Sequence, residues 1–259
     1  MTDGARVAVV IPARDEERLL PRVLAAVPPW VSSVVPVDDG SRDRTWDVIR
    51  AWHDPRALPM RLSPGRGVGA AIVAGYARAL DIGAEVVAVV AADAQMDLAE
   101  LETLVRPIAR GAADYVQGNR FRCGRPNGRM PLARHWGNAL LSASCSWAAG
   151  ARVGDSQCGF TAAGADFLGR LDRRRLPPGY GFPAFLRLEA QRMRARVVEV
   201  PVRALYGDEV SGIRPLLDPP WICARILWRG IERRLEHSVV RRPPVHAPAF
   251  GSKRIGEAG

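Results

Sequence analysis

The chain has 259 residues, of which 47% are hydrophobic and 25% charged, so it can form a globular protein with a large core. Its net charge of +10 comes almost entirely from arginine and favours phosphates or anionic lipid over nucleic acid, for which no recognition motif is present. No apolar run approaches the about 20 residues that span a bilayer, and four cysteines without paired spacing favour a reduced, cytoplasmic protein.

Short apolar runs and segments of helical spacing alternate over the first 110 residues. This alternation predicts a parallel, doubly wound sheet of the α/β class. The predicted strands cover residues 7–11, 34–37, 60–62 and 86–90, and the predicted helices cover about 19–24, 43–49, 70–80 and 98–109.

After Gly111 the pattern is looser, and polar segments at 154–160 and 206–212 are typical of loops. We interpret residues 1–217 as one continuous domain that changes character near residue 110. The further predicted strands cover 114–117 and 196–202, and the further predicted helices cover 132–149 and 184–193.

Residues 218–240 predict an amphipathic helix with an apolar stripe and a row of arginines beside it. The stripe either lies at a membrane surface, with the arginines toward anionic lipid, or packs on the core while the arginines are solvated. The tail at 241–259 contains Pro and Gly and predicts disorder. The stripe contains Trp221, Ala224, Leu227, Trp228, Ile231 and Leu235, and the arginines are Arg225, Arg229 and Arg233.

Acidic residues follow three of the predicted strands, at 15–17, at 38–39 and at Asp93. The carboxyl ends of parallel strands meet at one edge of a sheet, where α/β folds bind ligands. Asp93 and Gln95 offer hard oxygen donors for Mg²⁺ or Mn²⁺ held together with a diphosphate. The alternative at each position is ordinary helix capping, which we expect for Asp97 before the helix at Leu98.

Two further segments have a functional and a bland interpretation. The glycine-rich segment 65–69 departs from the dinucleotide fingerprint. It either lets a nucleotide approach the backbone, with Arg66 on a phosphate, or forms a turn before a helix. An arginine cluster either binds an anionic acceptor such as a phosphate or forms a solvated loop. The cluster contains Arg120, Arg122, Arg125, Arg129 and Arg134.

Motifs in a fixed order then connect the chain to a known family. VVIPARDEE, VDDGSRDRT, GRGVGAA, AADAQMD, GNRF, DSQCGF and GDEVSGI occur between about residues 6 and 217. The set resembles family-2 inverting glycosyltransferases, most closely the polyprenyl-phosphate branch that includes dolichyl-phosphate mannosyltransferase. The resemblance implies a GT-A fold, a nucleotide-diphosphate sugar donor and Mg²⁺ or Mn²⁺. It also implies a nucleotide-sugar half at 1–110 and an acceptor half at 111–217.

The resemblance assigns roles to individual residues. Asp93 and Gln95 match the metal-binding Asp and Gln of a DxDxQ pattern, and Asp93 also faces the nucleotide. Catalytic roles fall to Asp93, Arg120 and Arg134. The implied nucleotide-binding residues are Pro12, Arg14, Glu16, Asp39, Arg66 and Asp93, and the implied acceptor-binding residues are Arg120, Arg134, Asn138 and Ser211.

Three positions depart from the family pattern. Ala91 replaces the first acid of DxDxQ, Gly212 stands where a lysine often follows the serine, and Asp15 stands where many relatives have Asn. The first two changes put donor binding or donor choice in doubt.

We predict a metal-dependent hexosyltransferase that inverts the anomeric centre and uses a phosphate acceptor, foremost a polyprenyl phosphate. Such an acceptor is already a nucleophile and needs no strong base. One alternative is a soluble hydroxyl acceptor with Asp155 or Asp208 as base, and another is a nucleotide-sugar-binding relative without turnover. The expected location is the cytoplasm, with a lipid acceptor placing the protein at the inner face of the cell membrane.

Overall fold

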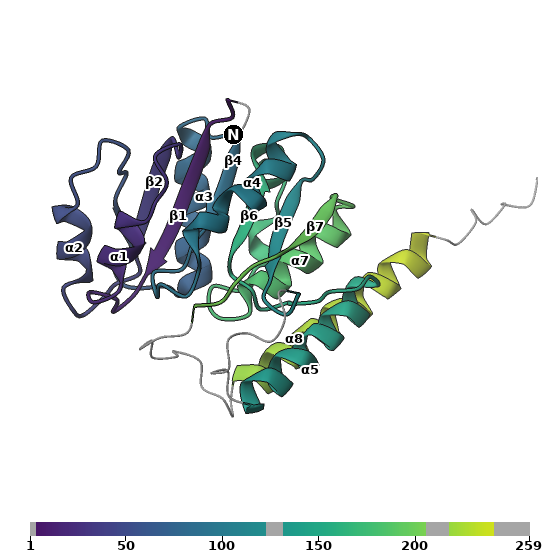
Figure 1. Ribbon diagram of the computed structural model, residues 1–259. Coiled ribbons are helices and arrows are strands. Elements are labelled where there is room, and N and C mark those ends of the chain that lie inside the picture. Colours follow the sequence, from purple (N-terminus) through teal and green to yellow (C-terminus); the bar gives the residue numbers. More distant parts are fainter. Residues whose placement is uncertain (1–3, 123–131, 206–217, 241–259) are drawn as a thin grey trace, which may run out of the picture.

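In the computed structural model, residues 4–122, 132–205 and 218–240 are described, with side chains at 4–122, 136–205 and 220–235. A seven-stranded sheet in the order β3-β2-β1-β4-β6-β5-β7 lies between layers of helices (Figure 1). The strands are β1 (Val7–Ala13), β2 (Ser33–Asp38), β3 (Met60–Arg61), β4 (Val86–Val89), β5 (Tyr115–Asn119), β6 (Thr161–Gly164) and β7 (Val197–Pro201).

The helices follow the strands along the chain, as the alternating pattern predicts. The α-helices are α1 (Leu20–Ala25), α2 (Thr45–Ala51), α3 (Val68–Asp81), α4 (Leu101–Ala109), α5 (Leu132–Ala149), α6 (Ala165–Gly169), α7 (Phe182–Arg192) and α8 (Asp218–Val240). The 3₁₀ helices are η1 (Leu98–Glu100) and η2 (Arg173–Arg175).

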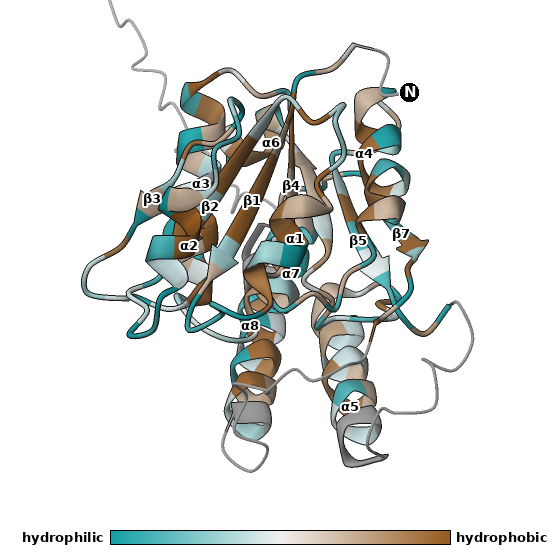
Figure 2. Cartoon of the chain, turned by 60° about the vertical axis from the view of Figure 1, so that its left-hand side comes forward, coloured by the Kyte–Doolittle hydropathy of each residue, from teal (hydrophilic) through white to brown (hydrophobic). Residues whose placement is uncertain are grey.

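Side chains of the central strands alternate between two cores. In β1, Ala8 and Val10 face the layer that contains α3, α5 and α7, whereas Val9 and Ile11 face the layer that contains α1 and α4. A strand that is buried on both faces needs a nearly continuous apolar sequence. This is the reason for the apolar runs at 7–11 and 86–90, and Figure 2 shows the strands as mostly hydrophobic.

The sheet contains one antiparallel strand that the sequence did not reveal. β6 pairs antiparallel with both β4 and β5, so β4 and β5 themselves point in the same direction. The carboxyl ends of β1, β2, β4, β5 and β7 therefore lie at one edge, which we call the carboxyl edge. The predicted α/β class with a mostly parallel sheet is confirmed.

Helices α5 and α8 pack side by side and run in the same direction (Figure 1). Ser144 lies 3.1 Å from Cys223, and Gly230 lies against Trp147 and Ala148 further along. The pair extends beyond the carboxyl edge of the sheet (Figure 2). The predicted boundary at residue 217 stays a prediction, and the tail at 241–259 lies outside the described residues.

The described part of α8 buries a different face from its predicted apolar stripe. Ile222 and Ile226 are buried in the core, while Trp221 and Trp228 are 56% and 61% exposed. Arg225 stacks on Trp221 and on Phe185 of α7, with ring-centroid distances of 4.5 and 5.0 Å. Of the two alternatives for the stripe, packing on the core is therefore not observed.

The contact between α3 and β1 generates a test of this packing. A Cβ atom at Gly75 would overlap the side chain of Val10, which is fully buried. We expect Gly75→Ala to lower the free energy of unfolding by about 1–3 kcal/mol, the usual cost of overpacking. Denaturant unfolding measures the change.

The matched control is Gly137→Ala in α5, where an added Cβ meets nothing within 4 Å. Alanine is favoured over glycine inside a helix by about 1 kcal/mol, so this variant should be as stable as wild type or more stable. Equal destabilisation by the two substitutions would contradict the packing of α3 on β1.

Candidate active site at the carboxyl edge

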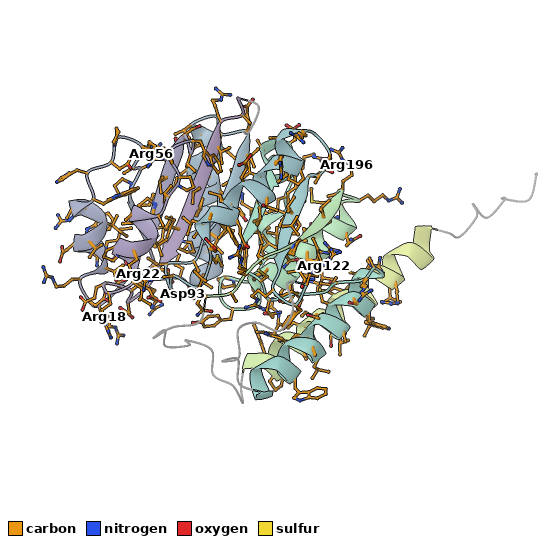
Figure 3. The ribbon with its side chains drawn as sticks, viewed as in Figure 1. Arg18, Arg22, Arg56, Asp93, Arg122 and Arg196 are labelled. Carbon is orange, nitrogen blue, oxygen red and sulfur yellow. The ribbon has the colours of Figure 1, made fainter. Side chains whose placement is uncertain are left out.

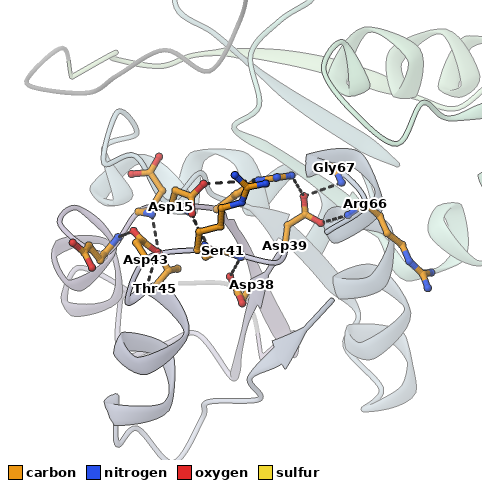
Figure 4. A network of polar contacts seen from close by, with 12 residues as sticks. Asp15, Asp38, Asp39, Ser41, Asp43, Thr45, Arg66 and Gly67 are labelled. Atoms are coloured by element: carbon orange, nitrogen blue, oxygen red, sulfur yellow. Dashed lines mark hydrogen bonds and ion pairs between the residues drawn. The ribbon is translucent and has the colours of Figure 1, made fainter. Parts of the chain in front are cut away.

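The loops that follow β1 and β2 are joined by reciprocal hydrogen bonds (Figure 4). The backbone N–H of Asp15 donates to Ser41 Oγ at 3.0 Å, and the carboxylate of Asp15 accepts from the N–H of Arg42 at 2.7 Å. The N–H of Glu16 donates to Thr45 Oγ1 at 2.8 Å. Asp15 thus holds the two loops together, and it does not cap a helix, because neither α1 nor α2 has a side-chain cap hydrogen bond at its N-terminus.

Asp38 and Asp39, at the end of β2, are both buried, and each has polar partners within the protein. Asp38 pairs with Arg61 at 2.9 Å. Asp39 accepts from the backbone N–H groups of Arg66 and Gly67 at 2.6 and 2.8 Å, and Arg14 Nη1 lies 3.6 Å away. Asp39 therefore fixes the glycine-rich segment beneath the end of β1.

The glycines of that segment permit close approach of other backbone. Gly67 has a positive φ of 102°, and a Cβ there would lie 2.5 Å from the carbonyl oxygen of Pro178. The N–H of Ala70 donates to the same oxygen at 3.0 Å. The segment thus does more than turn the chain, because it seats residues 177–180 against the start of α3.

A cavity of about 130 Å³ opens between these elements. Three of the residues predicted to bind the nucleoside line it together, whereas Glu16 does not. Arg66 is exposed, and its side chain extends away from Asp39 (Figure 4). The lining residues are Pro12, Ala13, Arg14, Asp39, Gly67, Val68, Gly179 and Tyr180.

Asp93 and Gln95 follow β4 at the same edge, and both side chains are half-buried. The N–H of Gln95 donates to Asp93 Oδ1 at 3.1 Å, and Ala94 between them has a positive φ of 57°. Asp97 caps η1 by accepting from the N–H of Ala99 at 3.0 Å, which confirms its predicted capping role.

Negative charge accumulates between the ends of β1 and β4. The pKa of Glu16 is raised from 4.5 to about 7, chiefly by burial and also by the nearby carboxylates of Asp93, Asp43 and Asp15. In the described part of the chain, no three acidic, histidine or cysteine side chains could hold a metal ion by themselves. Asp93 and Gln95 fit Mg²⁺ or Mn²⁺ only if phosphate oxygens complete the coordination.

The end of β5 carries a buried ion pair that sequence reasoning missed. Arg120 donates from Nε and Nη2 to the two oxygens of Asp155 at 2.7 and 2.9 Å. Asp155 is buried, and its loop is held by Glu199 of β7, which accepts from the N–H of Gly154 and from the amide of Asn119. The pairing makes Asp155 a poor candidate for a general base, because both of its carboxylate oxygens already accept from Arg120.

The other predicted acceptor residues are only partly described. The amide nitrogen of Asn138, on α5, is buried and makes no hydrogen bond to the described residues. Arg134 lies in the first turn of α5, and its side chain is not described. Ser211, Asp208, Gly212, Arg125 and Arg129 lie outside the described residues. Figure 3 places Asp93 and Arg122 at the carboxyl edge, with Arg56 and Arg196 toward the opposite edge.

Comparison with known proteins identifies the family. The family described as Glycosyl transferase family 2 matches residues 8–171, so the chain belongs to this family. It is a glycosyltransferase, as predicted. Among the helices that the structure describes, none has the length and apolar content to cross a membrane.

Similar proteins support the polyprenyl-phosphate branch. The undecaprenyl-phosphate mannosyltransferase of Micrococcus luteus is 31% identical, with 80% of this chain and 88% of the relative covered. The polyprenol monophosphomannose synthase of Mycolicibacterium smegmatis is 30% identical, with 80% and 82% covered.

A solved structure supports the fold. Glucosyl-3-phosphoglycerate synthase of Mycobacterium tuberculosis, in complex with Mn²⁺, UDP and product, matches with a TM-score of 0.62 at 20% identity. The match covers 89% of this chain and 80% of the synthase. The GT-A fold is therefore confirmed.

The raised pKa of Glu16 predicts a pH-dependent stability. The folded protein retains a proton on Glu16 that the unfolded chain releases near pH 4.5. The contribution of this group is therefore present below pH 4.5 and is lost as the pH rises through about 7. Glu16→Gln removes the charge, so its Tm should equal that of wild type at pH 4.5 and exceed it at pH 8.

Thermal unfolding at the two pH values measures this difference. Glu85→Gln serves as the control, because it removes a carboxylate that pairs with Arg6 at the opposite edge of the sheet. This control should gain no stability at either pH. A Tm difference for Glu16→Gln that is the same at both pH values would argue against the crowded acidic edge.

Proposed function

We propose that this glycosyltransferase moves a sugar, with inversion, from a nucleotide-diphosphate sugar to a polyprenyl phosphate, with the help of Mg²⁺ or Mn²⁺. The observation that carries the proposal is that the half-buried Asp93, after β4, and the cavity at the end of the neighbouring strand β1 lie at the same edge of the sheet. The named acceptors of the Micrococcus and Mycolicibacterium relatives support the choice of acceptor.

Asp93 and Gln95 would hold the divalent ion together with the donor diphosphate. When bound, such an ion neutralises charge on the leaving diphosphate. The Mn²⁺ and Mg²⁺ in structures of the mycobacterial synthase support the use of a metal. Ala91 stands where the family pattern has the first acid of DxDxQ. Its N–H donates to Met96 Sδ at 3.3 Å, and this bond connects the two ends of the loop 91–96.

The acceptor phosphate would bind at the carboxyl ends of β4 and β5, which point in the same direction. Asp155 holds the Arg120 guanidinium in one orientation before any substrate arrives. Arg134, Asn138 and Ser211 complete the proposed acceptor set. Because a phosphate monoester is already nucleophilic, positioning and charge stabilisation supply the catalysis.

The outer face of α5 and α8 favours a lipid acceptor over a soluble one. Among the described residues, ten large hydrophobic side chains are exposed, and eight of these lie on the two helices. Four of the eight are tryptophans, a residue that prefers the headgroup level of a bilayer. The face contains Trp136, Leu140, Trp147, Trp221, Leu227, Trp228, Ile231 and Leu235.

A transfer assay tests the proposal directly. A panel of nucleotide sugars is incubated with undecaprenyl phosphate in detergent or with soluble phosphate and hydroxyl acceptors, and lipid-linked sugar is detected by mass spectrometry. We expect metal-dependent product with the lipid phosphate. Product with only the soluble acceptors would show that the acceptor is not a lipid phosphate. If no nucleoside diphosphate is released under any condition, the proposed function is refuted.

Asp93→Asn should lower turnover by at least about 100-fold, the scale for losing one electrostatic stabiliser. Asp97→Asn is the matched control, because Asp97 caps η1 by accepting from the N–H of Ala99 and Asn caps a helix about as well as Asp. Initial rates of nucleoside diphosphate release give the comparison. Near-wild-type turnover of Asp93→Asn, or equal losses in both variants, would reject the assignment of Asp93.

Membrane contact is tested by replacing Trp221 and Trp228 together with serine. Both side chains are exposed, so the fold should persist, whereas deletion of α8 would also remove the buried Ile222 and Ile226. Wild-type protein should sediment with vesicles that contain anionic lipid, less so at high salt, and the double variant should sediment several-fold less.

The control for this experiment is Arg50→Gln, which removes one exposed charge on α2. It should sediment like wild type. A full-length protein that never sediments would refute the membrane contact. A protein that instead forms a dimer, which the double substitution disrupts, would show that another copy of the chain covers this face.

A further inference from the structure

The segment between η2 and α7, residues 177–181, is fixed from its α3 side. The carbonyl oxygen of Pro178 accepts from the N–H of Ala70 at 3.0 Å. An added Cβ at Gly69 would overlap the carbonyl oxygen of Pro177, so the two backbones are in direct contact. A side chain at Gly69 would push the segment away from α3.

The same segment is fixed from its α8 side. Gly181 is the N-cap residue of α7 and has a positive φ of 84°, a conformation that favours glycine. A Cβ at this position would lie 3.0 Å from Cγ2 of Ile222, which is buried in the core. Tyr180 thus lies between two anchored neighbours, although its own ring reaches solvent.

Tyr180 has the exposure and the position of a ligand contact. Its side chain is 44% exposed, and it lines the cavity together with Arg14 and Asp39. Apart from Leu205, it is the only exposed large hydrophobic side chain of the described residues that does not lie on α5 or α8. The proposed membrane contact therefore does not explain it.

Among the described residues that line the cavity, Tyr180 is the only aromatic one, so it alone of them offers a ring face to a ligand. Pro12, Ala13 and Val68 are apolar, and the Asp39 carboxylate already accepts from two backbone N–H groups. At about 130 Å³, the cavity is smaller than the about 300–1,000 Å³ that hold a whole ligand. It suits one ring system of a nucleotide sugar.

We propose that Tyr180 is the platform on which the nucleobase of the donor stacks. This role rests on the proposed function, since it requires a nucleotide donor at the end of β1. Stacking on an aromatic ring tolerates every base, because every base has a π face. Tyr180 then supplies affinity for the nucleoside, and the choice of base falls to other groups.

Calorimetric titration of the full chain with UDP, GDP and pyrophosphate, each with Mn²⁺, tests the role. Tyr180→Ala should lower the affinity for UDP and for GDP by similar factors of about 5–100. Tyr180→Leu, which retains apolar bulk but has no ring, should do the same. Tyr180→Phe should bind both within about threefold of wild type, because the face is retained. Pyrophosphate should bind equally to all four proteins, because it has no base.

The outcomes distinguish a failure of the stacking role of Tyr180 from a failure of the proposed nucleotide donor. Wild-type binding of nucleotides together with unchanged binding by Tyr180→Leu would overturn the platform and leave the function intact. Equal losses for pyrophosphate would also overturn it, because Tyr180 would then act on the diphosphate or on the fold. A wild-type protein that binds no nucleoside diphosphate would overturn the nucleotide donor itself.

Discussion

The crowding of carboxylates at the carboxyl edge of β1, β2 and β4 is the constraint on which the site depends. Backbone N–H groups and arginines contact Asp15, Asp38 and Asp39, which fixes the loops around the cavity. Glu16 instead has a pKa of about 7, because it is buried beside further acids that include Asp93. A proton can relieve this repulsion, and so can a divalent cation that arrives with a diphosphate.

Helices α5 and α8 contact the loops at this edge with their inner faces and are exposed on their outer faces. Ser142 and Ser146 of α5 bond to the loop that carries Asp155, and Ile222 of α8 packs on Gly181 beside Tyr180. Their outer faces carry most of the exposed apolar side chains of the described residues. One pair of helices therefore supports both the proposed donor side and the proposed acceptor side of the site, and under this proposal a lipid acceptor would approach along it.

The elements with strong local signals were predictable, and contacts between distant segments were not. The apolar run of β4 and the periodicity of α3 were sufficient, whereas β6 has the sequence TAAG and depends on partners far along the chain. For α8 the sequence predicted two faces but could not show that Ile222, not Trp221, is the buried one. Asp93 and Asp39 were found at strand ends, but the pairing of Arg120 with Asp155 and the place of Tyr180 require the fold.

The role of the acidic edge is measured by the coupling between the binding of Mn²⁺ and the binding of a nucleoside diphosphate. Isothermal titration gives the affinity of the protein for the nucleotide in the presence of Mn²⁺ and in the presence of a chelator. Because coupling is reciprocal, the nucleotide must raise the affinity for Mn²⁺ by the same factor. We expect each ligand to strengthen the binding of the other at least about tenfold, by neutralising charge around Asp93 and Glu16. Nucleotide affinity that is the same with Mn²⁺ and with the chelator would contradict it.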